Sequence, residues 1–184
     1  DPIELKKIIG YVPESGNMFN SLTAREFLNF IGTVRSLDEA KLKHRVQVFA
    51  SIFDFTGMLD MPLSALSKGN KQKVLITSAL LHDPDVIFLD EPLNGLDANS
   101  IFTFRDIVKD LSEKGKTVFY CSHLLDVIEK ISTRILLIDK GKIVLDKNTA
   151  DLKDSKDYTN LETLFKSMEP ESKRKKFSYD EIFG

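Results

Sequence analysis

The sequence predicts an α/β protein in which a parallel sheet is combined with an all-helical subdomain. After residue 85, short apolar runs at Val86–Leu89, Thr117–Cys121 and Ile135–Ile138 alternate with segments of helical periodicity. Strands that alternate with helices favour a parallel sheet. Residues 23–73, in contrast, repeat their apolar positions at helical spacing and contain no strand candidate. The chain has 184 residues, enough for one sizeable core.

The N-terminal part is expected to begin with a strand and to continue as helices. The β-rich run Ile8–Val12 is stopped by Pro13 and followed by turn-forming residues, which predicts a strand that leads into a loop. Thr23 and Glu26 have the spacing of a capping box, and the helix that they start is expected to end near Arg35.

Further helices and a hairpin are expected along the rest of the chain. They are a helix capped by Asp38 that ends near Phe53, helices at Ile101–Leu111, Leu124–Ile131 and Leu161–Met168, and a strand at Lys142–Leu145 that forms an edge hairpin. The tail after Asp146 is expected to be peripheral. Its basic run at residues 173–176 is interpreted as a solvated segment, with contact to anionic lipid headgroups as the alternative.

Composition excludes some classes of partner. The net charge is -2, from 26 basic and 28 acidic residues. Such a chain has no strong positive electrostatic field that would attract nucleic acid, so nucleic acid is not expected as a partner. Cys121 is the single cysteine, which rules out an internal disulfide framework and fits a reducing compartment. The longest apolar runs fall far short of the roughly 20 residues that a membrane-spanning helix needs.

Two carboxylates follow the apolar run Val86–Leu89. Asp90 and Glu91 therefore lie at the carboxyl edge of the predicted sheet, where ligands of such folds bind, and Pro92 stops the strand there. Neighbouring strand residues point to opposite sides, so the two carboxylates are expected to do different jobs. Asp90 is suited to binding a magnesium ion that is held on nucleotide phosphates. Glu91 is suited to polarising a water molecule that attacks the phosphate. The alternative is an acidic pair that only caps the following turn.

Two further segments carry polar groups that suit a phosphate. The string LSKGN at residues 66–70 opens a helix, and the free N–H groups beside Ser67 and Gly69 can bind an anion. Its alternative is an ordinary serine-capped helix. His123 directly follows the strand Thr117–Cys121 and would lie beside Asp90 if the two strands are neighbours. The alternative for this histidine is a surface position without a function.

These motifs, in this order, resemble the nucleotide-binding subunit of ABC transporters. LSKGN is similar to the family's signature motif, VIFLDEP at residues 86–92 to its Walker B strand, NGLD at 94–97 to its D-loop, and CSH at 121–123 to its switch-histidine region. Residues 8–28 resemble its Q-loop and the start of its helical subdomain. The resemblance covers residues 8–146 and implies part of a P-loop NTPase core, with a parallel sheet and an all-helical subdomain.

The resemblance also implies a division of the chain. Its segments are a Q-loop strand and loop at 1–20, a helical subdomain that ends in the signature helix at 21–80, the Walker B and switch-histidine half of the ATPase core at 81–146, and a peripheral extension at 147–184.

Roles in catalysis follow from the resemblance for one ATP site. It implies that Asp90 binds magnesium, that Glu91 acts on the hydrolytic water, and that His123 contacts the γ-phosphate. ATP and Mg²⁺ are the cofactors that the resemblance implies.

A second set of roles crosses to another subunit. Ser67 and Gly69 would face the ATP of a second nucleotide-binding subunit in a head-to-tail dimer, and Asp97 would help to join the two halves. The loop around Glu14 would receive a transmembrane permease. Phe19, Phe27 and Phe30 are candidates for this permease groove, and the competing interpretation places at least two of the three in the core.

The chain departs from the family pattern at several positions. Glu14 stands where the Q-loop normally has glutamine, so the resemblance implies a carboxylate near the magnesium and the phosphates of the cofactor, which could bind the metal or repel an anion. Lys68 and Asn70 replace the glycine and glutamine of the signature. The sequence contains no phosphate loop of the form GxxxxGK[ST]. We therefore expect an N-terminally truncated chain that by itself is inactive and binds ATP weakly or not at all. In the family fold, the strand of the phosphate loop lies beside the switch-histidine strand, so its absence would leave the switch-histidine strand as an exposed edge.

The resemblance thus implies the ATP-hydrolysing subunit of a transporter. It would couple ATP binding and hydrolysis to substrate movement through a separate permease, in the direction of export because of Glu14. It would lie in the cytoplasm at the inner face of the cell membrane. The alternatives are a soluble ABC-type ATPase that acts on ribosomes or DNA, and a module that serves only folding or interaction.

Overall fold

The computed structural model describes residues 1–16, 18–155 and 158–168. The chain divides into two compact units, Asp1–His123 and Leu124–Gly184. The basic run at residues 173–176 lies outside the described residues. None of the helices in the described ranges has the length and the apolar character that crossing a membrane requires. The four-part division expected from the sequence stays a prediction.

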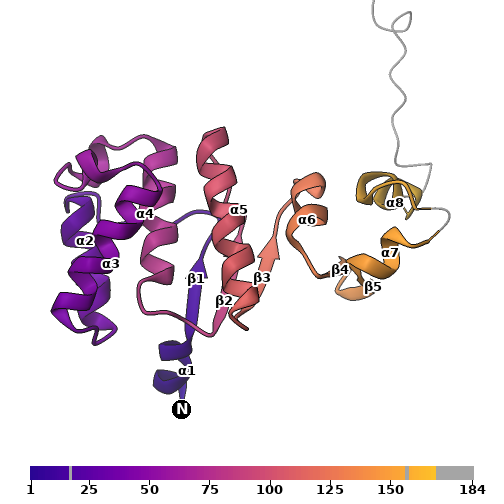
Figure 1. The fold of residues 1–184 in the computed structure, drawn as a ribbon, viewed down its shortest axis with the longest axis horizontal. Helices are drawn as coiled ribbons and strands as arrows, with labels where there is room; N and C mark the ends of the chain where they lie inside the picture. The colour runs from indigo at the N-terminus through magenta and orange to yellow at the C-terminus, as the bar shows by residue number, and fades with distance from the viewer. Residues whose placement is uncertain (17, 156–157, 169–184) are drawn as a thin grey trace, which may run out of the picture. The chain divides into compact units, whose positions relative to one another are not determined.

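The first unit combines a small sheet with helices (Figure 1). Its elements are α1 (Pro2–Ile8), β1 (Ile9–Val12), α2 (Ala24–Val34), α3 (Glu39–Ile52), the short 3₁₀ helices η1 (Thr56–Met58) and η2 (Leu63–Ala65), α4 (Lys68–Leu80), β2 (Val86–Asp90), α5 (Ala98–Glu113) and β3 (Thr117–Cys121). The expected strand at the start of the chain is one residue shorter than predicted, because α1 extends through Ile8. Helix α1 was not predicted, although Asp1 caps it and Pro2 is at its first position.

The strands form a parallel sheet in the order β1-β2-β3, as predicted for this part of the chain. The register aligns the carboxyl ends of β2 and β3, where Asp90 lies opposite Cys121. Among the described residues, β3 is an edge strand of this sheet. Polar groups that follow the two strands are therefore brought to one edge.

The two faces of the sheet differ in burial. One face carries the buried residues Gly10, Val12, Ile87 and Leu89, and α4 and α5 cover it, since α4 contacts β1 and α5 contacts β3. The opposite face carries Tyr11, Phe88 and Phe119, which are aligned in register and partly exposed. The rings of Phe88 and Phe119 stack with their centroids 4.8 Å apart.

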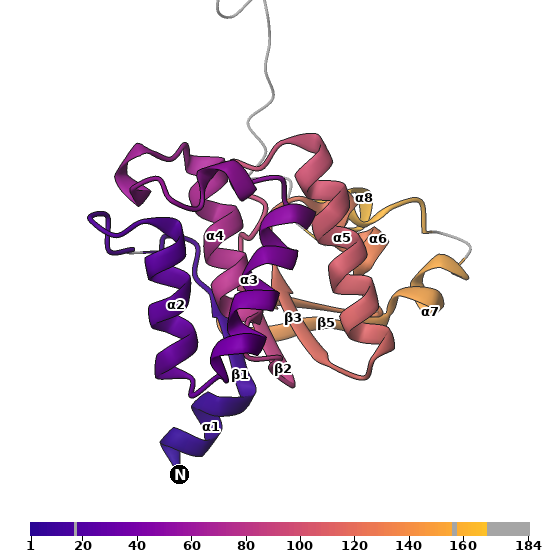
Figure 2. The ribbon, with the colours of Figure 1, turned by 60° about the vertical axis from the view of Figure 1, so that its left-hand side comes forward.

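Helix α4 connects the sheet to the all-helical subdomain. It contacts β1 on one side and α2 and α3 on the other (Figure 2). All of its residues from Gln72 to Leu80 are buried. The first unit therefore has a continuous core, in which α4 is the central element.

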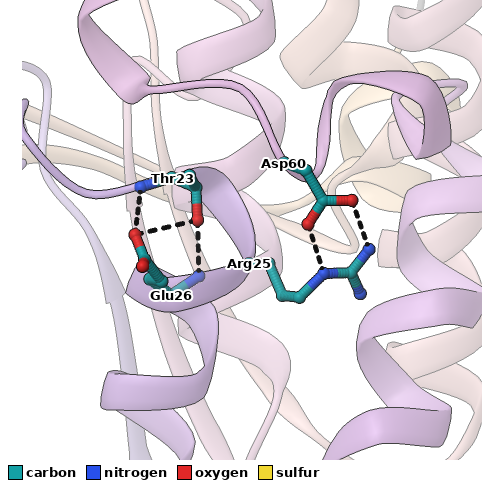
Figure 3. Close-up of polar contacts among 4 residues, drawn as sticks. All are labelled: Thr23, Arg25, Glu26 and Asp60. Carbon is teal, nitrogen blue, oxygen red and sulfur yellow. Dashed lines mark hydrogen bonds and ion pairs between the residues drawn. The ribbon is translucent and has the colours of Figure 1, made fainter.

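The predicted helix starts in the subdomain are confirmed. Thr23 and Glu26 form the capping box of α2, and Asp38 caps α3 by accepting the N–H of Lys41. Next to the capping box, Arg25 donates two parallel hydrogen bonds to the Asp60 carboxylate, 2.7 and 2.9 Å long (Figure 3). This fork fixes the start of α2 to the turn that precedes η2.

The second unit contains a β hairpin and short helices. Its elements are α6 (Leu125–Ile131), β4 (Arg134–Asp139), β5 (Lys142–Asn148), α7 (Thr149–Lys153) and α8 (Leu161–Met168). The prediction that Ile135–Ile138 joins the parallel sheet is wrong in the described structure, because β4 pairs antiparallel with β5. The predicted hairpin itself is present: the two-residue turn at Lys140 and Gly141, with φ angles of 48° and 75°, returns the chain so that β4 has its hydrogen-bond partners in β5.

A glycine in β1 allows the close approach of α4. A Cβ atom at Gly10 would meet the main-chain oxygen of Ala79 at 2.5 Å and the Cγ of Pro84 at 2.9 Å. A Cβ atom on Gly57, in η1, would meet no atom within 4 Å. The two glycines therefore form a matched pair for testing this packing.

We predict that Gly10→Ala lowers the free energy of unfolding by about 1–3 kcal/mol, because the backbone of α4 must move. Gly57→Ala should change it by less than about 1 kcal/mol. Urea denaturation of both variants measures the difference. Equal stability of the two variants would contradict the close contact between β1 and α4.

Candidate functional site

The site lies at the carboxyl edge of the parallel sheet, where β2 and β3 end. Asp90 is the last residue of β2, and the chain turns sharply at Glu91, whose φ is 45°. Positive φ is uncommon for a residue with a side chain and is a form of backbone strain that is frequent at functional sites. The Glu91 N–H donates a 2.9 Å hydrogen bond to the carbonyl of Cys121, which fixes this turn against β3.

The Glu91 side chain points to the residues that follow β3. Its Oε2 accepts a 3.1 Å hydrogen bond from the Ser122 hydroxyl, and its Oε1 accepts one of 2.8 Å from the His123 N–H. The same Oε1 lies 2.9 Å from Nδ1 of His123. Because a carboxylate can only accept, this contact assigns the proton to Nδ1 and leaves Nε2 for another partner.

Asp90 differs from Glu91 in its surroundings. In the part of the chain that the structure describes, its carboxylate has no hydrogen-bond or ion-pair partner. No group of three or more possible metal ligands exists in the described residues. A magnesium ion held on nucleotide phosphates needs only one or two protein carboxylates, so Asp90 alone fits such an ion. His123, which we expected beside Asp90, contacts Glu91 instead.

Ser67 and Gly69 lie at the start of α4. Ser67 caps the helix by accepting the N–H of Asn70 at 3.2 Å. A Cβ at Gly69 would collide with the carbonyl oxygen of Gly95, so the signature segment packs directly on the backbone of the NGLD segment. Gly69 is therefore needed for packing, whether or not it also approaches a phosphate.

Asp97 caps the helix that follows the NGLD segment. Its carboxylate accepts the N–H and the hydroxyl of Ser100 at 2.9 and 2.7 Å, which starts α5. It also forms an ion pair with Lys73, whose Nζ lies 3.1 Å away and whose side chain is only 8% exposed. The Ser100 hydrogen bonds, followed by Lys73, hold the pKa of Asp97 well below its usual range.

The ion pair of Lys73 with Asp97 was not predicted from the sequence. The available signal was the position of Lys73 inside the apolar run of α4, next to Val74 and Leu75, where a lysine stays buried only if it is paired. Its partner could not be identified from spacing, because Asp97 is separated from it by a strand and a loop.

Glu14 lies in the loop after β1 and lines a cavity of about 540 Å³. The other polar lining residues include Lys68, Lys71, Gln72 and Asn94. The structure therefore brings the Q-loop position, the signature segment and the residues after Glu91 around one cavity. Two lysine side chains in this lining supply positive charge beside the Glu14 carboxylate.

The phenylalanines expected at a permease groove separate into two groups. Phe27 is buried, whereas Phe19 and Phe30 are 58% and 47% exposed and contact each other edge to face, with centroids 5.7 Å apart. The interpretation that placed at least two of the three in the core is therefore wrong. The buried stripe of α2 consists of Ala24, Phe27, Leu28 and Gly32, and Phe30 falls outside it.

Comparison with known proteins identifies the family. The family model described as ABC transporter matches residues 2–94, half of the chain. The ABC transporter ATP-binding protein NatA of Bacillus subtilis (strain 168) is 30% identical over 168 residues, which cover 90% of this chain and 68% of that protein. The chain belongs to the ABC transporter family.

Other relatives agree with this assignment. The uncharacterised ABC transporter ATP-binding protein YthP of Bacillus subtilis is 36% identical, over 83% of this chain and 63% of its own length. The uncharacterised ABC transporter ATP-binding protein sll0415 of Synechocystis is 34% identical, over 81% of this chain and 43% of its own length. The chain thus spans between 43% and 68% of the length of these relatives.

A solved structure shows the same fold. It is titled "Structure of ATP binding subunit of ABC transporter" and superposes with a TM-score of 0.83 at 24% sequence identity. The match covers 90% of this chain and 70% of that chain. The α/β fold predicted from the sequence is therefore that of an ABC ATP-binding subunit.

We predict that Asp97 titrates well below the ordinary aspartate pKa of about 3.9. Because its folded pKa is depressed, the stability that it contributes is present above the unfolded pKa and is lost only as the pH falls through the folded value. Carboxyl NMR titration measures this pKa directly. Ser100→Ala should raise this pKa, because the bond from the Ser100 hydroxyl lowers it most, and Lys73→Met should raise it as well, because the variant removes a hydrogen bond and a positive charge. An ordinary pKa in the unmodified protein would contradict this geometry.

Proposed function

We propose that the intact protein hydrolyses ATP at the edge where β2 and β3 end. The observation that carries the proposal is the direct contact between Glu91 and His123, residues that are separated by a helix and a strand in the sequence. Two polar residues that the family motif places around a γ-phosphate are thus brought together by the parallel register. Membership of the family supports the same activity.

Each residue of this edge has a distinct role in the proposal. Glu91 would polarise the attacking water, since its carboxylate is oriented by Ser122 and by the main chain of His123. His123 would hydrogen-bond the γ-phosphate through Nε2, because Nδ1 is directed at Glu91. Asp90 would hold Mg²⁺, which supplies charge neutralisation for the β- and γ-phosphates when it is bound.

A second copy of the protein completes the proposed site. Ser67 and Gly69, at the exposed start of α4, would face the nucleotide held by the partner copy, as the family motif implies. Asp97 would lie at the same junction. A head-to-tail arrangement of this kind makes each site depend on both copies.

The proposed partner in the membrane is a permease with its own spanning segments. Phe19 and Phe30 form an exposed aromatic pair at the start of the all-helical subdomain, and Val34 on the same helix is also exposed. Exposed aromatic side chains that stand together are typical anchors of protein interfaces. We therefore place the protein at the inner face of the cell membrane, with this aromatic pair against the permease. Export is proposed as the direction of transport because Glu14 stands at the Q-loop position.

Glu91→Gln should leave ATP binding intact while hydrolysis falls by roughly 10²- to 10⁴-fold, because the amide cannot accept the proton of the water. Steady-state ATPase assays and nucleotide-binding titrations of the intact protein measure the two effects. The intact protein is needed because no GxxxxGK[ST] string occurs in these 184 residues. Glu113→Gln, on the exposed end of α5, is the control. Unchanged turnover in Glu91→Gln would remove Glu91 from the reaction.

Replacing both Phe19 and Phe30 by serine should reduce co-purification with the permease about tenfold or more, because two interface anchors are lost. The permease-independent ATPase activity should be retained. Phe102→Ser, on α5 and 59% exposed, is the matched control. Permease binding equal to that of the unmodified protein would exclude the aromatic pair from the interface. Co-purification with ribosomes or DNA in place of a permease would favour a soluble ABC-type ATPase.

A further inference from the structure

The loop between Glu91 and Asp97 is held by the first turns of α4. Gln72 is buried, and its side-chain amide donates a 3.0 Å hydrogen bond to the carbonyl of Pro92, the residue after Glu91. This contact fixes the loop at its beginning. A buried carbonyl that lost its donor would be left unsatisfied, which makes the contact costly to break.

The same loop is fixed in its middle and at its end. Gly95, with a φ of 82°, lies against Gly69, and a Cβ atom on either residue would meet the other segment. Two residues later, Asp97 forms its ion pair with the buried Lys73. All of these contacts come from the first two turns of α4, so the loop cannot shift relative to that helix without breaking one of them.

The loop has further contacts at its two ends, where Glu91 bonds to Cys121, Ser122 and His123 and Asp97 bonds to Ser100. Its own backbone hydrogen bonds join Asn94 N–H to the Glu91 carbonyl at 3.2 Å and Leu96 N–H to the Leu93 carbonyl at 3.1 Å. These bonds maintain the local turns but do not attach the loop to a neighbouring element. The main chain of Glu91 is bonded to β3 through the Cys121 carbonyl, and the attachment to α4 fixes the rest of the loop, so the two attachments together place Glu91.

We propose that Lys73 is a positioning residue for Glu91: it anchors the end of the 91–97 loop to the helix whose start carries Ser67 and Gly69. The inference rests on the proposed function for its consequence in catalysis, but its structural part is independent of that function. If Lys73 has this role, removing its charge alters the rate of the chemical step, although Lys73 is buried and contacts no nucleotide.

Lys73→Met is the informative variant because it keeps a long side chain in the core and removes the charge. Asp97 is not stranded by this change, since its carboxylate is exposed by 58% and keeps its Ser100 hydrogen bonds. The fold should therefore survive. Lys116→Met is the matched control, because Lys116 forms a similar ion pair with Asp83 and Asp85 at the opposite end of the sheet.

In the intact protein, Lys73→Met should lower kcat for ATP about 10-fold or more, as changes in residues that orient catalytic groups do. The KM should stay within about twofold, because the nucleotide is not contacted. Lys73→Arg, which keeps the charge, should restore most of the activity, and Lys116→Met should leave kcat unchanged.

Hydrogen exchange without nucleotide supplies a readout that does not depend on activity. The amides of Asn94 and Leu96 should exchange about tenfold faster in Lys73→Met, while those of β2 remain protected. Unchanged exchange, or faster exchange with unchanged kcat, would overturn the positioning role. If the protein with Lys73 intact does not hydrolyse ATP, the proposed function fails, whereas the exchange result still decides whether Lys73 holds the loop.

Discussion

The hydrogen bond from the Glu91 N–H to the Cys121 carbonyl is the contact on which the functional edge depends. It continues the parallel pairing of β2 and β3 by one residue, to the point where Glu91 adopts its positive φ. The turn directs the Glu91 carboxylate to Ser122 and His123 and leaves Asp90 at the strand end. A shift of the strand register by one residue would move every one of these side chains to the other face.

Helix α4 supports this edge from the side. It packs on β1 through the space that Gly10 leaves, contacts the all-helical subdomain, and holds the loop after Glu91 through Gln72 and Lys73. The helix start that carries Ser67 is therefore part of the same packed core as the end of β2. In the proposed dimer, a partner's nucleotide at Ser67 would act on an element that also positions Glu91.

Much of this arrangement could be predicted from the sequence, because local signals determine it. The capping box at Thr23, the cap at Asp38 and the apolar run before Asp90 each specify their element with a few neighbouring residues. The ordered motifs add the family and the parallel fold.

The parts that were missed depend on contacts between distant segments. The ion pair of Lys73 with Asp97 requires the packing of α4 against a loop that lies two elements later, and the exposure of Phe30 depends on which stripe of α2 faces the core. The most direct test of the account is a structure of the intact Glu91→Gln protein with ATP and Mg²⁺. We predict a γ-phosphate between His123 of one copy and Ser67 of a second copy, with the metal on Asp90. Nucleotide bound away from the ends of β2 and β3 would contradict the account.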